Sequence, residues 1–198
     1  METSRYLDRL LLKYSNTFNI YKTYHYCGID FPAYGFFEFH NEKYVLVREA
    51  NMWSSDSYEH VFFWQTDSVT PELFQKARDL IENHMEPELV RKGEKLPAQN
   101  HMCTLMTIIF ICDEQIPSDV FKMIRRYRFD KGYQFQLRGY SRGRIAAISM
   151  KDRKVVFSPD LRDSRKMFRD VFTEVDDGKD GFDAVCERQN IQSFRQEI

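Results

Sequence analysis

The most informative hydrophobic pattern in the chain is an apolar run from His101 to Cys112, which reads HMCTLMTIIFIC. Nine of its twelve residues are apolar, its β-branched residues gather toward its end, and it has no polar face. The run is too short to cross a membrane as a helix. A short apolar run without a polar face is typical of a strand covered on both sides. The pattern therefore predicts a central buried strand.

A second strand–turn–helix unit precedes this run. The segment 59–66 is predicted to be a strand, and Thr70-Pro71-Glu72 then opens a helix with a hydroxyl cap, a proline in the first turn and an acid near the positive helix end. The central run likewise continues into a helix that begins near Pro117-Ser118. Either an internal duplication or two examples of a common βα unit explains the likeness. Both explanations predict a right-handed parallel crossover.

Helical spacing and alternation predict the remaining elements. Apolar stripes predict helices over 5–14, 70–81, 117–127 and 158–172. A β-hairpin is expected with strands at 36–40 and 44–48 around an Asn41-Glu42 turn, and a loop is expected at 51–58. Strands are expected at 133–137, 144–150 and 154–157. The charged segment 87–100 is expected to be a long loop.

These elements together predict an α+β protein. Its mixed β-sheet of about six or seven strands is expected to pack with about three or four helices in an α/β sandwich. One domain is expected over residues 1–172. Residues 173–198 are expected to form a flexible or partner-docking tail, because 176–181 is polar and lacks apolar periodicity.

Composition adds information on the core and the compartment. The chain has 198 residues and is 42% apolar, which is enough for one domain with a substantial core. Its four cysteines form no CxxC pair, and its first residues mix charges rather than resembling a signal peptide. We therefore expect a soluble cytoplasmic protein with reduced thiols and no membrane segment.

Local charge is far less even than the net charge of −1. Residues 122–154 contain eleven basic and two acidic side chains, a net charge of +9, so the rest of the chain carries −10. Interleaved arginines and aromatics can bind phosphates and stack on unpaired bases. They can equally be solvated faces, or pair with an acidic surface of a second subunit. The candidate ligand-binding residues are Arg126, Arg128, Tyr133, Arg138, Tyr140, Arg142 and Arg144.

Acidic residues follow both strands that lead into helices, and they are the candidate catalytic residues. Asp67 follows the first of these strands, and Asp113 and Glu114 follow the second. If the strands are parallel neighbours, the acids share one sheet edge, where Mg²⁺ could support phosphodiester cleavage. Alternatively, each acid only supports the helix that follows it.

Two H-x-C spacings offer low-ranking candidate metal ligands. His25 and Cys27, and likewise His101 and Cys103, would point to the same side of an extended strand. The four could close a tetrahedral zinc site, but they lack the short spacing of specific zinc motifs. Small core cysteines explain them as well. No phosphate-binding glycine loop or dinucleotide motif is present, so no metal or cofactor is predicted.

Three stretches carry a family resemblance: HNEKYVLVREA, HMCTLMTIIFICDEQIP and KGYQFQLRGYSRGRIAAISM. Over residues 1 to about 172 the chain resembles a bacterial domain family of unknown function. That resemblance implies no catalytic residues. The residues themselves favour a binding module that contacts nucleic acid or another anionic partner. The alternatives are a metal-dependent phosphodiesterase or nuclease and a homo-oligomer with charge-complementary halves.

Overall fold

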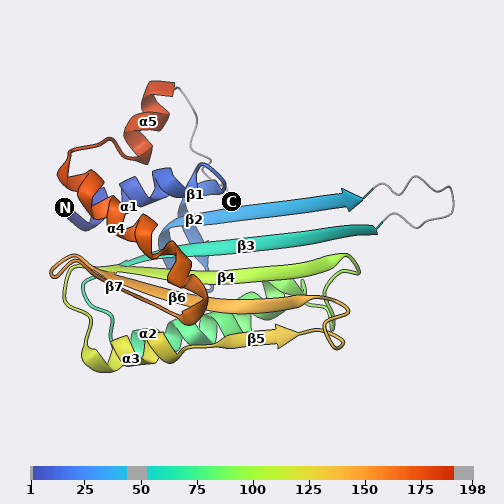
Figure 1. Cartoon of the computed structure of the whole chain (residues 1–198). Coiled ribbons are helices and arrows are strands. Elements are labelled where there is room, and N and C mark those ends of the chain that lie inside the picture. The colour runs from blue at the N-terminus through green and yellow to red at the C-terminus, as the bar shows by residue number, and fades with distance from the viewer. Residues whose placement is uncertain (1, 44–52, 190–198) are drawn as a thin grey trace.

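The computed structural model describes residues 2–43 and 53–189 and contains one mixed sheet of seven strands (Figure 1). The strands are β1 (Asn19–Tyr26), β2 (Ile29–Lys43), β3 (Trp53–Thr66), β4 (His101–Cys112), β5 (Phe129–Gly132), β6 (Tyr140–Ser149) and β7 (Lys154–Phe157). The α-helices are α1 (Glu2–Tyr14), α2 (Pro71–Asp79), α3 (Ser118–Arg126), α4 (Arg165–Asp176) and α5 (Phe182–Gln189). A π-helix, η1 (Leu80–Val90), continues α2, and a 3-10 helix, η2 (Pro159–Ser164), leads into α4.

The predicted central strand is β4, and it pairs in parallel with both of its neighbours, β3 and β6. Phe110 on β4 lies opposite Trp64 on β3 and Ala147 on β6. The strand order is β1-β2-β3-β4-β6-β5, with β7 also paired to β6, and all the other pairings are antiparallel. The predicted α+β class and mixed sheet are therefore confirmed.

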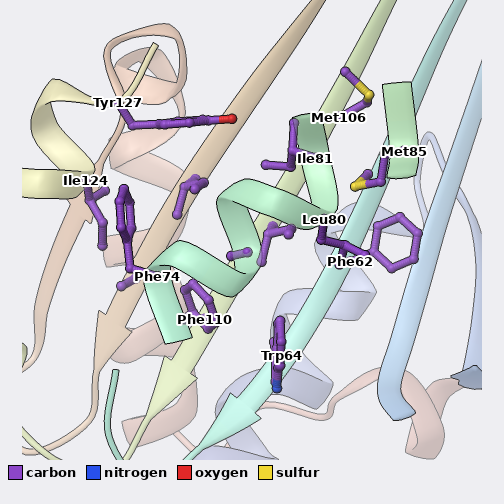
Figure 2. Close-up of a cluster of buried hydrophobic side chains, with 14 of the residues drawn as sticks. Phe62, Trp64, Phe74, Leu80, Ile81, Met85, Met106, Phe110, Ile124 and Tyr127 are labelled. Carbon is purple, nitrogen blue, oxygen red and sulfur yellow. The ribbon is translucent and has the colours of Figure 1, made fainter. Parts of the chain in front are cut away.

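Helices cover both faces of this sheet and create two separate hydrophobic cores. On one face, side chains of α2, η1 and α3 pack on alternate residues of β3, β4 and β6 (Figure 2). On the other face, α1 and α4 pack on the remaining residues of the same strands. A strand buried on both faces needs apolar residues at consecutive positions, which is why β4 lacks a polar face.

The β2–β3 hairpin differs from its prediction. Asn41 and Glu42 do not form a turn, because both lie inside β2 and pair with Ser55 and Ser54 of β3. Residues 53–58, predicted as a loop, form the first part of β3. Strand pairing satisfies these polar residues through their backbone, which composition does not reveal. The expected strand 44–48 lies outside the described residues.

The loop predicted from Pro87 onward also differs, because the helix continues through Pro87 to Val90. The wider hydrogen-bonding pattern of η1 turns Met85, Glu86 and Val90 into the protein, where all three are buried. Glu86 is stabilised there by ion pairs with Arg91 and Lys131. The charged residues of this segment suggested a solvated loop, but one of them, Glu86, is buried and paired inside the protein.

The strand predicted at 133–137 is instead a turn. Gln134, Phe135 and Gln136 all have positive φ angles, and β5 ends before them at Gly132. Tyr133 is buried because its hydroxyl donates to Glu86 over 2.7 Å, while Phe135 and Leu137 are exposed. The alternation of apolar residues wrongly predicted a strand here, because the alternating side chains do not lie on one buried face.

The C-terminal part of the chain continues beyond the predicted helix end near 172. Helix α4 runs to Asp176, and α5 lies against α1, where Phe182 is buried. The backbone N–H of Asp183 donates to Asp8 of α1 over 3.0 Å. Over the described parts of the chain, no helix is both long and apolar enough to cross a bilayer.

The packing predicts a large difference between two Phe→Ala substitutions. Phe110 is fully buried in the core, whereas Phe135 is fully exposed. Phe110→Ala should lower the free energy of unfolding by about 3–5 kcal/mol because it leaves a cavity in the core. Phe135→Ala, the matched control, should change it by less than about 0.5 kcal/mol. Urea denaturation measures both, and equal effects would contradict the packing described for β4.

Candidate functional site

A groove runs along the sheet edge at β7, between α3 on one side and the η2–α4 segment on the other. It consists of two adjoining cavities of about 680 and 400 Å³. Both cavities are lined by Phe121, Arg125 and Arg162, so they form one continuous surface. Val155, Val156 and Phe157 of β7 line the groove between these two walls.

Seven basic side chains line this groove, which we call the basic groove. Wall α3 contributes Lys122, Arg125 and Arg126, whose spacing places them on one helix face. The opposite wall contributes Arg162, Arg165 and Arg169, and β7 contributes Lys154. Asp152 is the acidic residue among the lining residues, so the lining carries a net charge of +6.

Most of these charges have no counter-ion. Lys154 pairs with Asp152 over 2.9 Å, and the Arg125 guanidinium lies 5.9 Å from the Phe121 ring centre. In the described part of the chain no carboxylate forms an ion pair with the remaining five, which are Lys122, Arg126, Arg162, Arg165 and Arg169. Burial opposes ionisation of Asp152, yet hydrogen bonds from Lys154 and Ser149 hold the pKa of its carboxyl below the usual range. The groove therefore concentrates uncompensated positive charge.

The sequence-predicted ligand residues are divided by the structure. Arg126 lines the basic groove, and Arg128 is exposed just beyond α3. Arg144 is buried and pairs with Glu59, and it also donates to the Thr107 hydroxyl. Of these three arginines, one lines the groove, one is exposed on the surface and one is buried.

The other four predicted ligand residues each contact another residue of the chain. Tyr133 is buried against Glu86, and Arg138 donates to the Pro97 carbonyl over 3.3 Å. Arg142 pairs with Asp130 over 2.7 Å and lies 4.8 Å from the centre of the Tyr140 ring. Arg142 and Tyr140 are partly exposed on β6, where that strand lies between β4 and β5. The local density of basic residues in the sequence thus grouped side chains that the fold places apart.

Sequence reasoning missed three arginines of the groove. Arg162, Arg165 and Arg169 lie outside the basic segment 122–154, so the local charge count excluded them. Their spacing in a segment correctly predicted as helical was the available signal, because it places them along one side of a helix. Only the fold brings them opposite α3.

The candidate catalytic acids lie at neighbouring strand ends, as the parallel pairing requires. Thr66 is opposite Cys112, and the Glu114 N–H donates to the Asp67 carbonyl over 2.9 Å. Two of the side chains have other partners, since Asp113 accepts from the Thr3 hydroxyl and Glu114 pairs with Lys151. Across residues 2–43 and 53–189, the three do not form a group with ligand atoms within 4.8 Å of one another.

The predicted zinc ligands likewise have separate partners. His25 pairs with Asp30, while His101 is buried, with Nδ1 donating to the Arg138 carbonyl and Nε2 bonded to the Thr104 hydroxyl. Cys103 lies on β4, and Cys27 is exposed in the turn between β1 and β2. Cys27 does belong to a group of potential metal ligands, but neither His25 nor His101 is part of that group.

A second cavity, of about 410 Å³, lies between β2, the start of β3 and the segment that follows η1. Its lining combines apolar residues such as Phe36 and Leu96 with buried Asp56, His60 and His101. Asp56 is stabilised by hydrogen bonds with the His40 ring, the Asn100 amide and the Tyr58 hydroxyl. The cavity is therefore mixed in character rather than basic.

His60 predicts a measurable acid sensitivity. Burial lowers its pKa to about 4, whereas the unfolded value is about 6.5. Between these values only the unfolded chain binds the proton, so the folded state loses stability as the pH falls. The loss should be about 2 kcal/mol between pH 7 and pH 5.

Urea denaturation at both pH values measures this loss. His60→Gln, which cannot titrate, should be less sensitive to the same pH change by that amount. An identical pH dependence in the two proteins would mean that His60 does not remain neutral in the folded state.

Comparison with known proteins adds one finding. The model of the family described as "Domain of unknown function (DUF8052)" matches residues 2–170. No curated protein and no solved structure matches the chain. The matched residues include all seven strands and the basic groove. The predicted resemblance to a domain family of unknown function is confirmed, whereas its bacterial source stays a prediction. The chain belongs to the DUF8052 family.

Proposed function

We propose that this domain is a binding module whose basic groove holds a single-stranded nucleic acid through its phosphates. The observation that carries the proposal is the convergence of seven basic side chains on one groove, five of which have no ion-pair partner among residues 2–43 and 53–189. Uncompensated arginines repel one another, and phosphate anions relieve that repulsion. An arginine also binds phosphate through two parallel hydrogen bonds.

The length of the groove favours a chain of phosphates over a single one. Arg162 and Arg169 are seven residues apart, which corresponds to about 10 Å along a helical segment. This wall is longer than a single phosphate group and can therefore contact more than one phosphate of a strand. Phe121 is partly exposed in both halves of the groove, where a base could stack on it.

Residues outside the groove add to its basic surface. Arg128 follows α3 directly, and the Tyr140–Arg142 pair lies on β6, between β4 and β5, on the strand that also pairs with β7. In this proposal the groove provides the main contacts, while these three residues contact a longer strand. Arg144, Arg138 and Tyr133 have mainly structural roles, because each is bonded to the protein interior or backbone.

Charge reversal in the groove should weaken binding of labelled single-stranded RNA or DNA. Arg125→Glu/Arg162→Glu should raise Kd on the order of 100-fold at low salt, because two charged hydrogen bonds are lost. The dependence of log Kd on log salt should also become shallower, by about 0.7 for each lost phosphate contact. Fluorescence anisotropy across a salt series, with metals chelated, measures both.

A matched control is Lys92→Glu/Lys95→Glu, which makes the same charge change on exposed residues outside the groove. It should leave Kd within about threefold, since only distant screened charges change. An equal loss of affinity in both variants would mean that binding depends on the overall charge of the protein and not on the groove. Absence of binding by the wild-type protein at low salt, or a salt-sensitive mass by light scattering without ligand, would favour an acidic protein surface as partner.

A further inference from the structure

Three side chains with different metal-binding atoms meet on the surface away from the basic groove. The thiol of Cys27, the imidazole of His84 and the carboxylate of Glu88 each offer a ligand atom, and these atoms lie within 4.8 Å of one another. Cys27 and Glu88 are exposed and His84 is partly exposed, so an ion can reach them from solvent. The site is separate from the acids at the carboxyl ends of β3 and β4.

Two structural elements bring these residues together. Cys27 lies in the tight turn between β1 and β2, with Gly28 beside it, and both have positive φ angles. His84 and Glu88 are four residues apart on η1 and therefore lie on the same side of it. The Tyr26 hydroxyl donates to Glu88 Oε2 over 2.9 Å, which attaches the turn to the helix.

A further carboxylate supports the histidine from behind. His84 Nδ1 lies 3.6 Å from Glu88 Oε1, while Nε2 lies 3.8 Å from Asp79 Oδ2. Asp79 is itself oriented, because the Asn83 amide donates to its Oδ1 over 2.7 Å. A histidine with a carboxylate behind one nitrogen and other ligands near the second is the usual arrangement in metal sites.

We propose that Cys27, His84 and Glu88 bind Zn²⁺ as three protein ligands, with Nδ1 as the ligand atom of His84 and a water in the fourth position. Thiolate and imidazole together select zinc over magnesium or calcium, which prefer oxygen ligands alone. Three protein ligands and one water is the composition of an open, tetrahedral zinc site.

Zinc binding at this site is linked to protonation. Burial and the nearby Glu88 carboxylate raise the pKa of the Cys27 thiol, so without a cation the sulfur retains its proton. Zinc binding forms the Zn–S bond and releases that proton to solvent. Affinity should therefore increase with pH. The bound ion would also connect the β1–β2 turn to η1.

Co²⁺ substitution and zinc titration of the full chain test the site. The wild-type protein should bind one equivalent of Co²⁺ with a sulfur-to-cobalt charge-transfer band in the near ultraviolet. Cys27→Ser should abolish the band, and His84→Gln should weaken zinc binding on the order of 100-fold or more because one direct ligand is lost. Asp79→Asn should weaken it about 10- to 100-fold, because the histidine loses its orienting partner.

Cys103→Ser and Cys186→Ser are the matched controls, since both remove a partly exposed thiol outside the group. They should retain the band and the affinity. A band that persists in Cys27→Ser, or that disappears in Cys103→Ser, would overturn the assignment. So would absence of stoichiometric Co²⁺ and Zn²⁺ binding by wild-type protein whose circular dichroism and urea denaturation are those of the folded state.

Discussion

The structure depends on the pairing of β4 with two parallel neighbours. Parallel strands need crossover connections, and these place helices on both faces of the sheet. Because β3, β4 and β6 are covered on both sides, their central residues are apolar at consecutive positions. Polar groups inside the sheet are paired internally, as Arg144 is with Glu59 and Thr107. The remaining polar chemistry is confined to the strand ends, the sheet edges and the outer faces of the helices.

This confinement explains where the candidate sites occur. The basic groove lies at the β7 edge, the mixed cavity lies where β3 and β4 begin, and the Cys27 group lies on the outer side of η1. In each case the fold brings together side chains from segments that are distant in the sequence. A rigid central sheet with variable periphery is a common way to support binding chemistry.

The sequence predicted the elements whose apolar residues face one environment. β4, the α2 start with its Thr70 cap and the helical face of α3 follow directly from apolar period and capping residues. Prediction failed where tertiary partners decided the conformation. Glu86 enters the interior only because Arg91, Lys131 and Tyr133 meet it there, and residues 53–58 form a strand only because β2 extends beside them.

The sequence predicted a cluster of basic residues, but it identified only some of the residues that line the groove. Local charge density included Arg126, which lines the basic groove, but it also counted Arg144, whose charge is neutralised internally by Glu59. Sequence distance concealed Arg169, which reaches the groove only when α4 packs beside β7. Basic residues that are close in the sequence are also close in space only within one helix or strand. The charge count along the chain could therefore not identify the residues that line the groove.

The position of the groove also bears on how the sheet ends. β7 is only four residues long and lies at the margin of the sheet, where unpaired backbone groups could add a strand from another molecule. Cationic side chains on both flanking helices would bring like charges together if two such margins approached each other. The same arginines that attract an anion thereby discourage the edge-to-edge stacking of sheets that begins aggregation.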